Sequence, residues 1–326
     1  MEGTAGERPM NLRVADSGLI DRLAKVLLFR SLSGIRDGSL RVYDGEVVRS
    51  FGQGGDLSAK VTVHAPGFYR YAAFGGSVGA GASYMDGAWT CDDLVSVVRI
   101  LVRNAEALSG LEGGAAILSR PLLRLYHALR RNTEKGSRRN IRDHYDLGND
   151  FYELFLDPSM AYSCGIFERS DSTLEEASRA KFDRACRKLD LRPGDQLLEV
   201  GCGWGGLAIH AARHYGCRVT GVTISGSQFE YARRRVRDAG LSDRITILLS
   251  DYRRIAGAFD KLVSVEMIEA VGHQYLDGFF RKCASLLKPD GAMLLQAITI
   301  PDRFYRRHLK TVDFIKRYIF PGSFIP

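Results

Sequence analysis

The sequence predicts an α/β protein whose main domain is a doubly wound parallel sheet, preceded by a smaller α+β domain. From residue 172 onwards, apolar strand-like runs alternate with amphipathic helices. The first of these runs, LLEVGCGWGGL at 197–207, passes directly into spaced glycines, which is typical of a buried strand, a tight turn and a helix start. A β-rich region lies before residue 115, and 326 residues are enough for two domains.

The first domain is expected to begin with an amphipathic helix and a β-hairpin. Residues 17–30 carry apolar side chains at helical spacing, with Arg22 and Lys25 on the opposite face. This helix either packs on its own domain, the favoured interpretation, or faces a membrane. SLRVY and EVVRSF then flank Asp44-Gly45, which is a strong hairpin signal between β-rich runs.

The rest of the first domain is predicted to be a strand, a connection and a helix. KVTVH at 60–64 alternates like a third strand. The glycine-rich segment 75–81 has no strand before it, so we predict a connection there. Residues 92–108 combine acidic residues in a first turn with an apolar stripe, which predicts a helix. We place this domain at 1–115 and expect it to associate with lipid.

A basic linker is predicted at 116–143. Lys and Arg dominate residues 120–142, where Glu134 is the single acid and Gly136-Ser137 interrupts the segment. The plain interpretation is a solvated surface. The functional one is attraction to anionic lipid headgroups, worth about 1 kcal/mol for each basic residue near such a surface.

The second domain, 144–326, is predicted from its alternating elements. The predicted strands are 197–201, 218–225, 245–252, 260–271 and 292–300, and the predicted helices are 172–191, 207–216, 227–240 and 275–291. Such alternation gives a parallel sheet with helices on both faces. The ligand of a sheet of this kind lies at the carboxyl ends of the strands, here where the first strand meets the glycines.

The composition of the chain indicates what kind of partner the protein binds and in which cellular compartment it lies. The net charge of +8, from 46 basic and 38 acidic residues, favours an anionic partner: nucleic acid, an anionic membrane or a phosphorylated substrate. The six cysteines show neither CxxC pairs nor zinc-type spacing, which indicates reduced thiols in a cytoplasmic protein. Neither a signal peptide nor a membrane-spanning run is recognisable, so we expect any membrane contact to be peripheral.

The glycine turn resembles motif I of S-adenosylmethionine (SAM) dependent methyltransferases. It differs from the dinucleotide-binding GxGxxG fingerprint in its glycine spacing and in its tryptophan. Five further segments of the chain also match a known sequence pattern, in order. They are HYDLGNDFYELFLDPSMAYSCGIFE (144–168), GVTISGSQ (221–228), LLSDYR (248–253), MIEAVGH (267–273) and FIKRYIFPG (314–322). Together they resemble the cyclopropane-fatty-acyl-phospholipid synthase family, including its mycolic acid cyclopropane synthase-like members. The resemblance is close over 140–322 and much less specific over 15–115.

The resemblance implies a fold and a reaction. The fold is a Rossmann-like class I methyltransferase sheet. The reaction transfers a methyl group from SAM to the cis double bond of an unsaturated acyl chain of a membrane phospholipid. The resulting carbocation loses a proton from the new methyl group and closes a cyclopropane ring. In the family, a bound bicarbonate ion accepts that proton and offsets the developing positive charge.

The resemblance also assigns residues by their motif positions. The implied SAM contacts are Tyr162, Ser163, Gly201, Cys202, Gly203, Thr223, Ile224, Gln228, Asp251 and Tyr252. The implied bicarbonate pocket and catalytic group consists of Cys164, Glu269 and Ile298, together with Gln296. No metal is expected. The second predicted strand lacks a terminal acid, so the ribose hydroxyls of SAM would need another partner such as Gln228.

Two departures from the family pattern leave alternatives open. Gln296 stands where bacterial members often carry histidine, and an amide can donate a hydrogen bond but cannot titrate in this range. A methylene- or methyl-branched product, which needs a reductase partner for the saturated branch, is therefore the first alternative. The chain stops at Pro326, so the C-terminal strands of the sheet are expected to be missing. A fragment that binds SAM or lipid without turnover is the second alternative, and a small-molecule methyltransferase the third.

The expected partners follow from the resemblance and from the net positive charge. They are an anionic phospholipid bilayer surface, a second copy of the chain in a possible homodimer, and the reductase just mentioned; nucleic acid is not expected. The expected location is the cytoplasm, peripheral on the inner face of the membrane.

Overall fold

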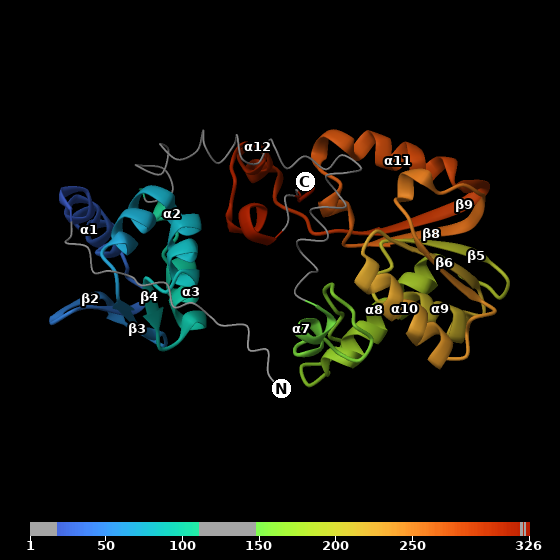
Figure 1. Ribbon diagram of the computed structural model, residues 1–326, viewed down its shortest axis with the longest axis horizontal. Coiled ribbons are helices and arrows are strands. Elements are labelled where there is room, and N and C mark those ends of the chain that lie inside the picture. Colours follow the sequence, from blue (N-terminus) through green and yellow to red (C-terminus); the bar gives the residue numbers. More distant parts are fainter. Residues whose placement is uncertain (1–17, 111–147, 320–321, 323) are drawn as a thin grey trace, which may run out of the picture. The chain divides into compact units, whose positions relative to one another are not determined.

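The computed structural model describes residues 18–110, 148–319, 322 and 324–326. The chain forms two compact units, one of residues 1–125 with 312–314 and one of residues 126–311 with 315–326 (Figure 1). The predicted linker at 116–143 lies outside the described residues. In the part of the chain that is described, none of the helices is long and apolar enough to cross a membrane.

In its described residues, the first unit contains a four-stranded sheet and the helices α1, α2 and α3. Its elements are α1 (Leu19–Leu32), β1 (Gly38–Asp44), β2 (Val47–Gly54), β3 (Ser58–Val63), α2 (Gly67–Met85), β4 (Trp89–Cys91) and α3 (Leu94–Arg103). The strand order is β2-β1-β3-β4, with only β1 and β3 parallel. The hairpin closes at Asp44 and Val47, as the Asp-Gly pair predicted, and Gly45 supplies a positive φ of 60°. The buried core includes Trp89 and the inward side chains of all four strands.

The glycine-rich segment 75–81 is not the connection that its composition suggested. It lies inside α2, which is kinked where Gly76 adopts φ 56° and ψ −144°. A side chain on Gly79 would place its Cβ only 2.0 Å from the Tyr71 carbonyl oxygen, so the kinked turns approach too closely for a larger residue. Burial of Phe68, Tyr69 and Ala72 anchors the helix, and this packing outweighs the poor helix propensity of glycine.

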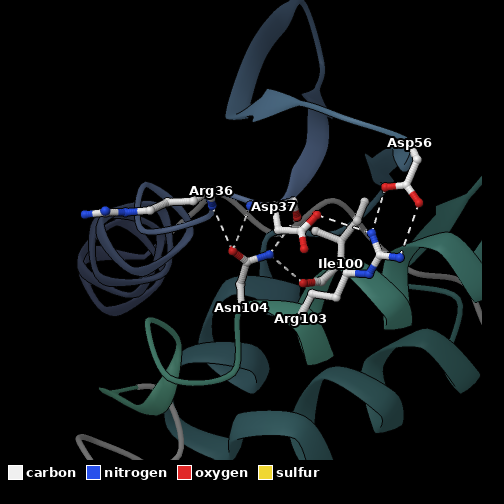
Figure 2. A network of polar contacts seen from close by, with 6 residues as sticks. All are labelled: Arg36, Asp37, Asp56, Ile100, Arg103 and Asn104. Carbon is white, nitrogen blue, oxygen red and sulfur yellow. Dashed lines mark hydrogen bonds and ion pairs between the residues drawn. The ribbon is translucent and has the colours of Figure 1, made fainter.

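Asn104, at the end of α3, joins the helix to the start of the sheet (Figure 2). Its Oδ1 accepts hydrogen bonds from the backbone N–H groups of Arg36 and Asp37, at 2.8 and 3.1 Å. Its Nδ2 donates to the carbonyls of Asp37 and Ile100, each at 2.8 Å. One buried amide thus satisfies four backbone groups, whereas the nearby pair of Arg103 and Asp56 is exposed.

We expect Asn104→Ala to destabilise the first unit by about 2–4 kcal/mol, because four backbone groups lose a hydrogen bond to a buried amide. Hydrogen exchange read by mass spectrometry should show faster exchange over residues 33–44. Asp56→Ala, which removes only the exposed ion pair, should leave exchange there nearly unchanged. Equal exchange in the two variants would contradict the role given to the amide.

The second unit is the parallel α/β domain that the sequence predicted. Its elements are α7 (Asn149–Glu153), α8 (Leu174–Lys188), β5 (Gln196–Val200), α9 (Gly206–Tyr215), β6 (Arg218–Thr223), α10 (Gly226–Asp238), β7 (Ile245–Leu249), β8 (Phe259–Val265), α11 (Leu276–Ser285), β9 (Leu287–Gln296), α12 (Asp302–Lys310) and a π-helical turn (Ile315–Ile319). The strand order is β7-β6-β5-β8-β9, and every described pairing is parallel. β5 lies at the centre, so the turn after it opens where the strand order reverses.

Helices cover both faces of this sheet (Figure 1). Leu197 of β5 packs in the cluster that contains α8, α9 and α10, whereas its neighbour Leu198 packs with α11 on the other face. Successive side chains of a strand point to opposite faces, so a strand covered on both sides must be apolar throughout. The run LLEV accordingly shows no alternation of apolar and polar residues: Leu197, Leu198 and Val200 are apolar, and Glu199 is a buried acid.

The last strand differs in detail from its prediction. β9 begins at Leu287, directly after α11, and Lys288 to Gly291 bulge out of it, because Leu287 pairs with Phe259 and Ala292 already pairs with Lys261. The predicted helix 275–291 therefore ends early, at Ser285. The strand ends at Gln296 rather than continuing to residue 300, although Thr299 forms an isolated bridge to Ile325.

Candidate active site

A cavity of about 570 Å³ lies at the carboxyl ends of the strands in the second unit. Its walls come from the turn after β5, the ends of β6 and β8, the segment after β7, and the stretch before α8. Thirteen of the residues assigned from the sequence line it: Tyr162, Ser163, Cys164, Gly201, Cys202, Gly203, Thr223, Ile224, Gln228, Asp251, Tyr252, Glu269 and Ile298. Gln296 does not line the cavity but contacts residues that do. The fold thus brings together assigned residues that are up to 136 positions apart, from Tyr162 to Ile298.

The glycine turn is shaped by close packing. Gly201 has a φ of 85°, and a Cβ at this position would lie 2.7 Å from Cγ of Met267. The N–H groups of Gly201 and Cys202 both donate to the Val222 carbonyl, at 2.9 and 3.0 Å, which ties the turn to β6. Burial raises the pKa of the Cys202 thiol well above its ordinary value, so this side chain acts as a small packed group rather than a nucleophile.

Trp204 and Arg235 hold the segment before α8 against the glycine turn. The Trp204 indole N–H donates to Asn149 Oδ1 at 2.8 Å, and the ring packs on Tyr152 with centroids 4.9 Å apart. The Arg235 guanidinium donates to the carbonyls of Pro158, Ser159 and Trp204, at 2.9, 2.8 and 3.0 Å respectively. One cation thus binds three carbonyl oxygens, which fixes the position of the chain just before Tyr162 and Ser163.

Lys181 is a buried residue of this site that the sequence did not single out. It extends from α8, and its Nζ donates to the Ser163 hydroxyl. Burial lowers the pKa of Lys181, although Glu266, the Cys164 thiol, Asp157 and Glu199 all act in the opposite direction. The helical periodicity of α8 shows that this face of the helix is buried, but a lysine is not expected on a buried face. Its role becomes clear only from the acidic side chains around it, which come from distant parts of the chain.

The far side of the cavity suits a sugar and a base. Thr223 Oγ1 donates to Gln228 Oε1 at 2.8 Å, which orients the buried glutamine and leaves its NH₂ group as a donor toward a ligand. Asp251 is held by the guanidinium of Arg253 at 2.7 and 2.8 Å. A carboxylate has lone pairs beyond those that Arg253 occupies, so Asp251 can still accept from an exocyclic amine. Tyr252 offers an aromatic ring beside it, packed edge-on against Phe279.

Glu269 and Ile298 form a small polar pocket in the wall of the cavity. The Ile298 N–H donates to Glu269 Oε1, while Glu269 Oε2 is buried without a hydrogen-bond partner among the described residues. Burial raises the pKa of Glu269, and the nearby Glu266 raises it further. A buried oxygen without a protein partner can accept a hydrogen bond from a ligand that enters the cavity. A small oxyanion with a hydroxyl group, such as bicarbonate, can donate such a bond.

Glu266 is a second acidic residue of this pocket, besides Glu269, and it was not among the residues predicted from the sequence. Its Oε1 accepts from the Cys164 N–H at 3.0 Å and from Gln296 Nε2 at 2.8 Å. Gln296 Nε2 also lies 3.3 Å from the Cys164 sulfur. Gln296 therefore acts on the cavity through Cys164 and Glu266.

Glu199, the last acid before the glycines, is a buried residue of the cavity lining, and one of its carboxylate oxygens has no hydrogen-bond partner among the described residues. Burial raises its pKa from 4.5 to about 8, even though Lys181 opposes the shift. In this range the native state holds a proton that the unfolded state releases, so Glu199 makes stability fall as pH rises from about 4.5 to about 8.

We therefore expect Glu199→Gln to remove part of that pH dependence. Urea unfolding at several pH values should show the variant gaining stability over the parent protein as pH rises from about 5 to about 8, with no further gain above. Glu175→Gln, an exposed change on α8, should run parallel to the parent throughout. A constant difference between Glu199→Gln and the parent would mean that Glu199 is ionised in the native state.

Comparison with known proteins is consistent with this geometry. The sequence profile of the mycolic acid cyclopropane synthetase family matches residues 132–326. The chain is 39% identical over 274 residues to the cyclopropane-fatty-acyl-phospholipid synthase of Escherichia coli K12, covering 83% of this chain and 68% of that protein. It is 37% identical over 259 residues to the tuberculostearic acid methyltransferase UfaA1 of Mycobacterium tuberculosis, covering 77% of this chain and 60% of that protein.

Solved structures show the same relationship. The mycolic acid cyclopropane synthase CmaA1, in complex with SAH and CTAB, superposes with a TM-score of 0.53 at 40% identity, over 58% of this chain and 70% of that one. The cyclopropane synthase MmaA2 from Mycobacterium tuberculosis gives a TM-score of 0.53 at 35% identity, over the same shares. The chain therefore belongs to the mycolic acid cyclopropane synthetase family, and it is a SAM-dependent methyltransferase.

Proposed function

We propose that the protein transfers a methyl group from SAM to the cis double bond of an unsaturated acyl chain in a membrane phospholipid and forms a cyclopropane ring. One observation carries the proposal: the glycine turn, the Tyr162–Cys164 segment and the pocket of Glu269 and Ile298 all open into one cavity. A weakly nucleophilic alkene reacts only when it is held against the sulfonium methyl in a space that excludes water. A single cavity can hold both reactants in that way.

The residues of this chain would divide the work between the two ends of the cavity. Gly201 and Gly203 would let the backbone approach the methionine part of SAM, and Gln228 would donate to the ribose hydroxyls. At the other end, Cys164, Glu269 and the Ile298 backbone would hold a small anion beside the new methyl group. Bicarbonate bound there would supply the base that takes the proton and a negative charge opposite the carbocation.

The membrane as the source of substrate is supported by α1 of the first unit. This helix buries Ala24, Leu28 and Leu32 but exposes a stripe of large apolar side chains. That stripe consists of Leu19, Ile20, Leu23, Val26 and Leu27. An exposed apolar helix face on a protein of net charge +8 suits an anionic bilayer, so we propose peripheral binding on the inner face of the membrane.

A methyl-branched product is the second candidate. The similarity to a tuberculostearic acid methyltransferase and the presence of Gln296 in place of histidine favour it. The same carbocation would then lose a proton from the neighbouring chain carbon and leave an alkene. A saturated branch would further require a separate reductase with its own electron donor.

Incubation with SAM and liposomes tests these proposals. Mass spectrometry of the lipids should show a gain of one CH₂ unit, and the product should resist mild hydrogenation if it is a cyclopropane but take up hydrogen if it is a branched alkene. SAM binding by calorimetry together with liposome flotation, but without product, would instead support binding without turnover. Transfer that does not depend on liposomes would contradict the phospholipid assignment.

A further inference from the structure

Glu266 stands at the junction of three segments that meet at the cavity. It follows β8 directly, and its carboxylate receives the Cys164 N–H from the segment before α8 and the Gln296 amide from the end of β9. Its own N–H donates to the Gln296 carbonyl at 2.8 Å. The two side-chain bonds span 102 and 30 residues of sequence, so they join parts of the chain that no local element connects.

The backbone of Glu266 is held in an unfavourable conformation. Its φ of 47° lies in the left-handed region, which is unfavourable for an L-residue other than glycine because Cβ crowds the backbone. In the part of the chain that the structure describes, Met160, Asp190 and Glu266 are the non-glycine residues with positive φ, and both Met160 and Glu266 line the cavity. Such strain persists where surrounding contacts over-determine it, and it concentrates at functional sites.

The contacts of Glu266 fix the two ends of the reaction relative to each other. Cys164 adjoins Tyr162 and Ser163, which are assigned to SAM, while Gln296 lies two residues before Ile298, whose N–H holds Glu269. A link through Glu266 Oε1 therefore sets the distance between the methyl donor and the group that receives the proton. Displacement of a reacting group by about 1 Å can cost 10²-fold in rate.

We infer that Glu266 is a positioning residue that couples the SAM-binding segment, through Cys164 and Gln296, to the pocket of Glu269 and Ile298. The inference rests on the proposed function for the identity of the two ends. What Glu266 supplies is an oxygen that accepts two hydrogen bonds. Glutamine at this position retains such an oxygen and loses only the charge, whereas alanine loses both.

The kinetic test compares Glu266→Ala, Glu266→Gln and the surface control Glu230→Ala, with the full chain, SAM and liposomes. The alanine variant should lose about 10²-fold in kcat with little change in the KM for SAM, and the glutamine variant should recover most of that loss. A glutamine variant as slow as the alanine variant would overturn the inference and point to the charge instead. A joint loss of SAM affinity and thermal stability would also overturn it, since that marks a merely structural residue.

A second measurement needs neither lipid nor turnover. Burial raises the pKa of the Cys164 thiol, and Glu266 raises it further. Both Glu266 variants should therefore speed the alkylation of Cys164 by iodoacetamide at neutral pH, read by peptide mass spectrometry, with Cys91 of the first unit as an unchanged internal reference. An unchanged Cys164 rate would refute the contact, whereas inactivity of the parent protein with liposomes would refute only the phospholipid substrate.

Discussion

Glu269→Gln should lower kcat by about 10²-fold or more and leave the affinity for SAM nearly unchanged. Glutamine keeps the oxygen that accepts from the Ile298 N–H, so the fold of the pocket survives the change. It replaces the buried, unpaired Oε2 with an NH₂ group that cannot accept a hydrogen bond. The pocket then loses its acceptor toward a hydroxyl-bearing anion, and the step after methyl transfer slows.

Calorimetric titration with SAM and steady-state turnover on the same preparations provide the comparison. Cys164→Ala, in the same cavity lining, should behave in the same way, while the exposed Glu168→Gln should match the parent protein. Loss of SAM binding in step with turnover would place Glu269 in the SAM site and remove it from the proton-accepting pocket.

Arg235→Met should destabilise the second unit by about 3 kcal/mol and weaken SAM binding. Methionine fills similar space but leaves the carbonyls of Pro158, Ser159 and Trp204 without their donor. Because these carbonyls anchor the stretch that leads to Tyr162, the SAM-facing wall of the cavity should loosen as well.

Arg237→Met is the matched control, since it lies on α10 and its side chain is exposed. Urea unfolding and SAM titration should distinguish the two variants clearly. If both variants bound SAM as tightly as the parent, the stretch before Tyr162 would not depend on the Arg235 clamp.

The parallel sheet was predictable because its signal is local and repeated. Each strand is a short apolar run, and the helix next to it shows apolar residues at the spacing of an amphipathic helix. LLEVGCGWGGL marks the turn where the ligand binds. The positions of Tyr162, Gln228 and Asp251 in the cavity followed from motif resemblance, and the structure places them there. What each of them contacts in a bound complex stays a prediction.

The features that escaped prediction are those decided by tertiary contacts. The glycines at 75–81 weaken a helix on propensity alone, and only the close approach within α2 explains them. Lys181 and Glu266 look like surface charges in the sequence, because nothing local shows that Ser163 faces the first or that Cys164 and Gln296 face the second. Such networks depend on partners far away in the chain.

The placement of the two tryptophans gives each unit its own optical reporter. Trp89 lies in the core of the first unit, and Trp204 belongs to the glycine turn of the second, where its indole N–H donates to Asn149. In a Trp89→Phe background, emission comes from the cavity wall alone, so a ligand entering beside Gly203 should alter its intensity or wavelength. Occupancy by SAM could then be followed in real time and without any lipid, independently of whether the first unit is bound to a bilayer.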